Sequence, residues 1–371
     1  MIEWFLNIFQ NKKKNITENE TNEIKYKKPN NENLVISKIQ IKTIINKEIH
    51  NFFLLEDGRI LISYSYYKES KKKYNSLINV YNPNTFEEEI KLDLEEDIIQ
   101  IGLSYSQNII ILIQKYILIY EINKKGISLI QKIKDNIIED STFSEYKNGK
   151  YLIISNQINN PTYEHFESLF PETYDSILTF YQLENKIYKY KESDKINEIS
   201  GKILCDENNI IIYGIKDTTV GSNPLSNIGF AFLYDKDNSD KGKYIFHTEK
   251  LFQWKYSYSI DCIFLMNNFL LIVTDSKSFI YNLNEKLLID INIEPDIKFV
   301  FKNDNFFFFI KYIIEKKKLI LKLYKYDYNM KLIGMEENNI NAKIHIYDMI
   351  KGNGNSLFIN ENNEKIYFLE Q

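Results

Sequence analysis

Arginine is almost absent from the sequence: Arg59 is the only one, so 46 of the 47 basic residues (47 minus one) are lysines. A lysine attracts phosphate as a point charge, but it lacks the planar fork with which arginine binds carboxylates and phosphates through two bonds. This scarcity excludes sites that need clustered arginines. Together with the heavy use of Asn, Ile, Lys, Tyr and Phe, it is typical of a gene from an AT-rich genome.

Residues that carry catalysis or bind metals are also few. The four histidines are far apart and show no metal-ligand spacing, and neither a Gly-rich phosphate loop nor a nucleophile elbow is present. We interpret the acidic clusters at residues 87–89 and 95–97 as solvated charges and not as paired catalytic carboxylates. We therefore expect no catalytic residue, metal, cofactor or small-molecule substrate. The histidines are His50, His165, His247 and His345.

The sequence also lacks a long apolar run and a surplus of positive charge. No apolar run reaches the roughly 18 residues that a membrane-spanning helix needs, so none is expected. The net charge of −4 and the isoelectric point near 5.8 disfavour a nucleic-acid-binding surface. We expect a cytoplasmic protein, with association at a membrane surface left open.

What the sequence does contain is a repeated pattern of strands. Residues 49–93 read as four short β-rich runs joined by turns, the first turn being Glu56-Asp57-Gly58. The third run ends in an apolar residue followed by a tyrosine, and this ending recurs at steps of 39, 61, 53, 47, 43 and 43 residues. A period of roughly 40–50 residues predicts an all-β, seven-bladed β-propeller of four-stranded antiparallel blades, although the longest step leaves the blade count open by one. The tyrosines are Tyr81, Tyr120, Tyr181, Tyr234, Tyr281, Tyr324 and Tyr367.

The two ends of the chain predict how the ring closes. The last stretch, residues 340–371, offers only three strands, one fewer than a full blade. Residues 34–45 alternate apolar and polar side chains and precede the first complete blade. Pairing of this N-terminal strand as the outer strand of the last blade would close the ring and protect its exposed edge.

The recurring ending of the third strand resembles the apolar–Trp–Asp ending of WD repeats, with tyrosine in place of tryptophan. The resemblance covers residues 34–371, but no Trp-Asp dipeptide and no regular Gly-His pair occurs. It implies a propeller that closes through its N-terminal strand and binds other proteins. Kelch repeats, sialidase-type propellers and phosphoinositide-binding propellers fit worse, because they need a Gly-Gly doublet or several arginines.

The N-terminal region, residues 1–33, is predicted to be separate from the propeller. Residues 1–10 can form a short amphipathic helix, followed by three lysines at residues 12–14 and a polar, flexible linker. No secretory signal pattern is present. The helix could contact a membrane surface or a partner's groove, or it could pack on the propeller or fray. The residues expected to make a membrane or partner contact are Trp4, Phe5, Ile8 and Phe9.

Long loops between the second and third strands are predicted in three repeats, at residues 67–75, 157–175 and 216–227. Long loops on a rigid scaffold commonly carry binding sites. The second of them contains apolar and aromatic residues that could form an anchor for a partner or fold back onto their own blade. These residues are Tyr163, His165, Phe166, Leu169 and Phe170.

From these patterns we expect a non-catalytic scaffold that docks a protein partner on one propeller face. The alternatives are a peripheral membrane adaptor held by its N-terminal helix and, less favoured, an enzyme on a propeller scaffold. Cys205 and Cys262 fall in predicted inner strands of neighbouring blades. They are interpreted as buried, reduced thiols, with a disulfide or redox pair as the alternative.

Overall fold

The computed structural model describes most of the chain between residues 38 and 370, and these residues belong to one compact unit, Ile36–Gln371. The helix predicted for residues 1–10, with Trp4, Phe5, Ile8 and Phe9, lies outside the described residues. The described residues are 38–42, 49–69, 73–82, 85, 87–123, 126–159, 174–197, 199, 201–220, 223–238, 240–247, 260–266, 268–274, 278–290, 297, 299–302, 307–315, 318–327, 329–340, 346–351, 357–361 and 365–370.

Within this part of the chain, the strands form seven four-stranded antiparallel sheets. The first three sheets are β2 (Ile49–Leu54), β3 (Ile60–Lys68), β4 (Lys73–Tyr81) and β5 (Glu88–Leu94); β6 (Gln100–Leu103), β7 (Ile109–Ile113), β8 (Tyr116–Asn123) and β9 (Gly126–Lys134); and β10 (Thr142–Tyr146), β11 (Tyr151–Asn159), β12 (Tyr174–Glu184) and β13 (Ile187–Ile196).

The next three sheets follow the same plan of four consecutive strands. They are β14 (Lys202–Cys205), β15 (Ile210–Val220), β16 (Asn223–Tyr234) and β17 (Gly242–His247); β18 (Ile260–Met266), β19 (Phe269–Thr274), β20 (Ser278–Asn282) and β21 (Leu287–Asp290); and β22 (Phe299–Lys302), β23 (Phe307–Glu315), β24 (Lys318–Tyr326) and β25 (Leu332–Ile340).

The remaining sheet joins the two ends of the unit. It consists of β26 (Ile346–Lys351), β27 (Leu357–Glu361), β28 (Lys365–Glu370) and, as its outer strand, β1 (Lys38–Lys42). β1 is antiparallel to β28 over five residue pairs, from Lys38 opposite Glu370 to Lys42 opposite Ile366. The predicted pairing of the N-terminal strand with the last sheet is therefore confirmed.

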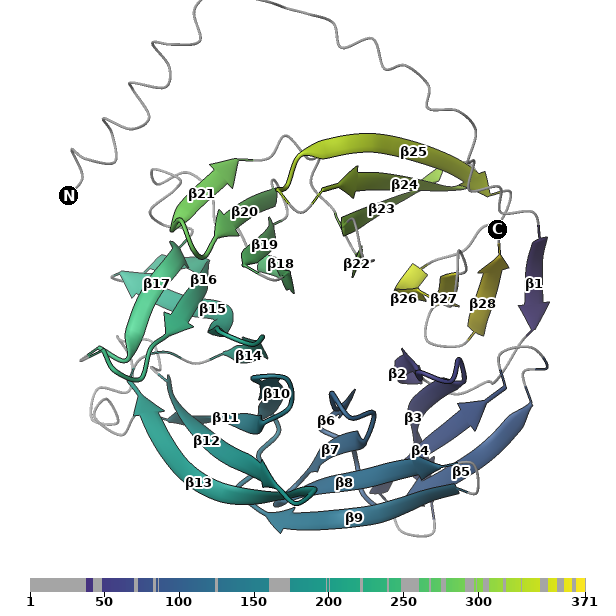
Figure 1. Cartoon of the computed structure of the whole chain (residues 1–371), viewed down its shortest axis with the longest axis horizontal. Helices are drawn as coiled ribbons and strands as arrows, with labels where there is room; N and C mark the ends of the chain where they lie inside the picture. Colours follow the sequence, from purple (N-terminus) through teal and green to yellow (C-terminus); the bar gives the residue numbers. More distant parts are fainter. Residues whose placement is uncertain are drawn as a thin grey trace, which may run out of the picture. The chain divides into compact units, whose positions relative to one another are not determined.

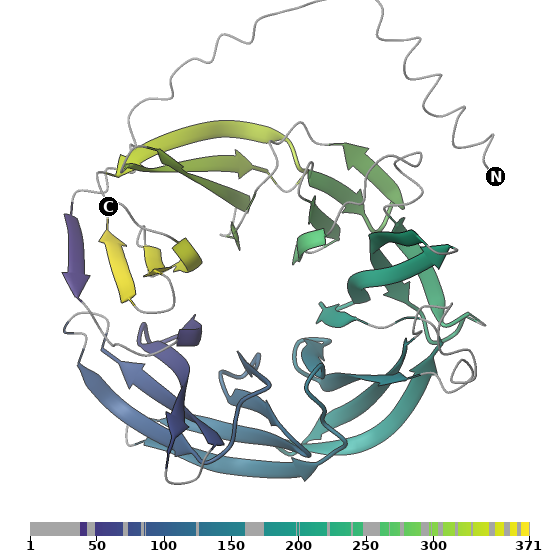
Figure 2. The same cartoon turned by 180° about the vertical axis from the view of Figure 1, so that it is seen from behind.

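The sheets of this unit follow one another around a common centre, with the first strand of each sheet innermost and the last outermost (Figures 1 and 2). Because neighbouring strands run in opposite directions, the connections fall at two ends of the sheets. We call the end with the turns at residues 55–59, 104–108 and 147–150 the first face. The second face carries the connections at residues 95–99 and 114–115.

The core lies between neighbouring sheets. All five residues of β7 are buried. Its side chains Ile109 and Ile111 pack with Leu61 and Ile78 of the preceding sheet. A strand that is covered on both faces needs such a continuous apolar run.

The run of four phenylalanines at residues 306–309 has the same explanation. Phe307 and Phe309 are fully buried, in a cluster with Leu271 and Val273 of the neighbouring sheet. These two side chains therefore belong to the core and not to a ligand patch.

The cysteines occupy first strands of neighbouring sheets, as predicted: Cys205 ends β14, and Cys262 lies in β18. The Cys205 thiol forms no disulfide. Burial raises its pKa to about 12, so it stays protonated and unreactive at neutral pH.

The described residues form no helix, and hence none that could cross a membrane.

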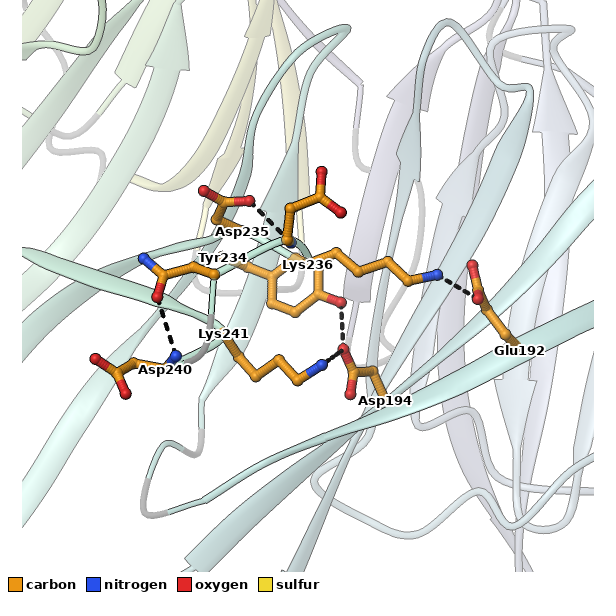
Figure 3. Close-up of polar contacts among 9 residues, drawn as sticks. Glu192, Asp194, Tyr234, Asp235, Lys236, Asp240 and Lys241 are labelled. Carbon is orange, nitrogen blue, oxygen red and sulfur yellow. Dashed lines mark hydrogen bonds and ion pairs between the residues drawn. The ribbon is translucent and has the colours of Figure 1, made fainter.

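The repeated tyrosine of the third strand connects neighbouring sheets. Tyr234 of β16 donates a hydrogen bond of 2.6 Å to Asp194 of β13, the outer strand of the preceding sheet (Figure 3). Tyr181 of β12 likewise donates to Asp135, which follows β9, at 2.7 Å. A buried tyrosine needs a partner for its hydroxyl, and here the partner belongs to the adjacent sheet. In these two repeats, the signature tyrosine thus also fixes the contact with the preceding sheet.

Figure 3 shows two ion pairs beside the contact between Tyr234 and Asp194. The Lys241 ammonium lies 3.2 Å from the Asp194 carboxylate. Lys236 pairs with Glu192, which lies on the same strand as Asp194. Burial opposes ionisation of Asp194, but hydrogen bonds from Tyr234 and Lys241 outweigh it and hold the pKa of this carboxyl below its ordinary value.

We expect the substitution Asp194→Asn to lower the free energy of unfolding by about 1 kcal/mol at neutral pH. Because the pKa of Asp194 is lower in the folded protein, its contribution is present above the unfolded-state pKa and is lost as the pH falls through the folded-state value. Urea unfolding across this acidic range should show the gap between parent and variant closing. The exposed Asp240→Asn is the matched control, and a gap that is independent of pH would contradict the assignment.

Candidate functional site

A groove of about 190 Å³ opens between the first two complete sheets, towards the second face. Its floor is apolar: Leu94, Leu118 and Tyr120 are almost fully buried, and Ile113 continues the floor. Leu129 of β9 also lines the groove but is 50% exposed, so it offers apolar surface at the edge. The floor arises because the third strand of one sheet packs against the outer strand of the preceding one.

The rim of the groove is acidic. Asp93, Glu95 and Glu96 line it, opposed by the single ammonium of Lys132. Asp93 is exposed and is oriented by the Tyr66 hydroxyl, which lies 3.0 Å from each carboxylate oxygen. Lys132 lies 3.9 Å from the centre of the Tyr116 ring. The local charge balance favours a cationic group at the mouth of the groove.

An exposed aromatic pair lies near the hairpin that joins β3 and β4. Tyr67 and Tyr74 are 51% and 56% exposed, with ring centres 5.3 Å apart in an edge-to-face arrangement. Exposed tyrosines are enriched at protein-binding surfaces.

The structure corrects the prediction of a long loop at residues 67–75. β3 continues to Lys68 and β4 begins at Lys73, so Tyr67 and Tyr74 face each other across a hairpin. The same correction applies to residues 216–227, where β15 reaches Val220 and pairs with β16 at Asn223. Tyrosines and β-branched residues favour paired strands, and this preference outweighs the polar content of both segments.

The segment proposed from sequence as a partner anchor, with Tyr163, His165, Phe166, Leu169 and Phe170, lies outside the described residues. The strands that lead into it are paired up to Asn159 and Tyr174, two positions inside the predicted start of the loop and one inside its predicted end. Nothing in the described structure therefore brings these five residues together with the groove.

Sequence reasoning missed the groove itself. Residues 95–97 were interpreted as solvated charges, and only the packing of two sheets shows that Glu95 and Glu96 border an apolar floor. One sequence signal could have indicated the groove. Apolar and polar residues largely alternate along β9, but Leu129 and Ile130 are adjacent apolar residues, and both of these side chains are exposed. Among the described residues, no three His, Cys, Asp or Glu side chains are grouped closely enough to hold a metal ion.

Comparison with known proteins identifies the fold class. No family model and no curated protein matches the sequence. A TM-score of 0.53 relates the structure to the β-propeller domain of the Trilobed protease from Pyrococcus furiosus, which is 10% identical over 88% of this chain and 94% of that one. A chain of the mitotic checkpoint complex also scores 0.53, at 9% identity over 96% of this chain and 98% of that one.

A peptidase gives a further match. The structure of Pyrococcus horikoshii acylaminoacyl peptidase is 11% identical, with a TM-score of 0.53, over 84% of this chain. This chain spans only about half (48%) of that peptidase. These likenesses show the fold alone: the described unit is a β-propeller.

Proposed function

We propose that the chain is a seven-bladed, WD-repeat-like β-propeller that acts as a non-catalytic scaffold for a protein partner. Seven four-stranded sheets among the described residues support the blade count, and the pairing of β1 with β28 supports closure of the ring. The third-strand tyrosine takes the place of the tryptophan of WD repeats. The groove with its apolar floor and acidic rim is the observation that supports the scaffold function.

The chemistry of the groove defines its partner. An apolar floor accepts a leucine-sized or aromatic side chain, and the rim of Asp93, Glu95 and Glu96 attracts lysine or arginine beside it. The partner would therefore present an extended segment with one apolar anchor flanked by basic residues. The apolar edge at Leu129 would cover this anchor once the segment is bound.

A peptide library selected against the full chain tests this proposal. We expect the selected peptides to share an apolar residue with basic neighbours. Leu129→Lys, which places a cation at the edge of the floor, should raise their dissociation constants by at least about thirtyfold, the size of a binding hot spot. Binding should be measured by fluorescence anisotropy.

Leu287→Lys is the matched control, because Leu287 is similarly exposed, at 43%, on the outer strand of another sheet. It should leave the dissociation constants unchanged. Equal losses in both variants, or selected peptides without basic residues, would refute the docking site.

The membrane-adaptor alternative rests on Trp4, Phe5, Ile8 and Phe9 and stays a prediction from sequence. Binding to anionic liposomes that disappears on deletion of residues 1–14 would favour it over the groove-based scaffold. The absence of binding at low ionic strength would dismiss it.

A further inference from the structure

On the first face, away from the groove, three lysines gather around two neighbouring tyrosines. The ammonium groups of Lys150 and Lys191 lie 5.6 and 4.8 Å from the centre of the Tyr151 ring. Lys191 also lies 3.3 Å from the Tyr151 hydroxyl, and Lys147 lies 5.2 Å from the ring of Tyr146. The two rings are themselves 6.2 Å apart. The three cations thus share one small surface, and all three side chains are exposed.

Backbone features place these lysines together. Asn148 and Gly149 have φ values of 53° and 77°, and the Lys150 amide donates to the Lys147 carbonyl at 3.1 Å. This is the tight hairpin turn that the Asn-Gly pair predicts, and it holds Lys147 and Lys150 side by side. Lys191 approaches from β13 as the extra residue of a β-bulge, because Phe180 pairs with Glu192 and Tyr181 pairs with Tyr190.

The first complete sheet has a bulge at the same place but opposite chemistry. There Glu89 is the extra residue, and it lies 3.7 Å from Arg59, which also pairs with Asp57 at 2.7 Å. Arg59 and Tyr151 occupy equivalent positions in their sheets. Each directly precedes the residue of the second strand that pairs with the signature tyrosine of the third strand. The cation of the first sheet is thus neutralised by carboxylates, whereas the cluster in the third sheet has none.

The carboxylates that border the turn at residues 147–150 are occupied by neutral donors. Glu145 accepts hydrogen bonds from the Tyr188 hydroxyl, at 2.5 Å, and from the Tyr105 amide. Glu207 accepts from the Asn148 side chain at 2.6 Å, and Asp206 caps its own turn through two backbone amides at 2.7 Å. Among the described residues, none of the three lysines forms an ion pair.

We infer that Lys147, Lys150 and Lys191 form a binding site for a phosphate dianion on the first face of the propeller. Ammonium groups suit phosphate because they act as compact point charges, and three of them match a dianion with charge to spare. Tyr151 can add a hydrogen bond from its hydroxyl. The lysines also hold the pKa of Tyr151 below its ordinary value, chiefly through the hydrogen bond from Lys191, which agrees with a positive local potential.

The phosphate could be a free anion or a phosphorylated side chain, and the test includes both. Inorganic phosphate and a phosphoserine peptide of otherwise neutral sequence would be titrated into the full chain by calorimetry at low ionic strength. Substituting all three lysines by glutamine (K147Q/K150Q/K191Q) should raise both dissociation constants about tenfold. A peptide that binds more tightly than inorganic phosphate would identify a phosphoprotein as the source, and equal affinities would identify the phosphate group alone.

The control variant K115Q/K134Q/K243Q removes the same charge from three exposed lysines in other places. Its dissociation constants should stay within about twofold of the parent, because only adjacent charges act on the anion at close range. Thermal melting verifies that both variants are folded, and the single substitution Lys191→Gln provides a milder test with a smaller loss in the same direction. Equal weakening in the cluster and control variants, or no binding by the parent, would overturn the site.

Discussion

Deletion of residues 34–45 is expected to lower the free energy of unfolding by about 5 kcal/mol, a large part of the stability of a typical protein. The deletion removes β1 and its five backbone pairings with β28. The last sheet would keep three strands, and β28 would become an unpaired outer edge. We therefore expect a large fall in melting temperature together with aggregation through the exposed edge.

Differential scanning calorimetry with light scattering checks this expectation. Deletion of residues 11–22 is the control, since it shortens the chain by the same length within the predicted linker. That variant should melt like the parent. A protein without residues 34–45 that also melts like the parent would show that β1 contributes little to closure.

This closure could be predicted because it depends on counting. Alternating side chains at residues 34–45 and a last repeat with three strands leave one arrangement in which every sheet has four strands. The turn at Asn148-Gly149 can also be predicted from sequence. An Asn-Gly pair favours positive φ values, and both residues adopt them here. Local patterns that allow a single solution can be read directly from sequence.

Other features depend on strand pairing or packing that local sequence patterns leave open, and they could not be predicted. The extent of the β3–β4 hairpin depends on whether Tyr67 and Tyr74 pair, and a tyrosine-rich polar segment permits either a strand or a loop. The groove requires Glu95 of one sheet to lie beside Leu129 of the next, at a distance in sequence that no local pattern encodes. The lysine cluster depends on a β-bulge that brings Lys191 to Tyr151.

The signature tyrosine of the first repeat belongs to a buried polar cluster, which differs from the contacts of its counterparts. The Asn79 side chain donates to the Tyr64 hydroxyl at 2.7 Å, to the Tyr81 hydroxyl at 3.0 Å and to Glu88. Asn79, Tyr64 and Tyr81 are almost completely buried. Burial raises the pKa of both tyrosines, so their hydroxyls stay protonated.

We expect Asn79→Ala to lower the free energy of unfolding by about 3 kcal/mol, because it removes one buried donor to each of the two hydroxyls and creates a cavity. Urea unfolding at neutral pH measures this loss, with Asn136→Ala, an exposed asparagine, as the control. The double substitution Tyr64→Phe with Asn79→Ala should lower the free energy of unfolding by less than the sum of the two single substitutions. The reason is that Tyr64→Phe removes one of the hydroxyls that lose a hydrogen bond when Asn79 is replaced. Additive losses would mean that Asn79 acts by filling space and that the hydrogen bonds contribute little.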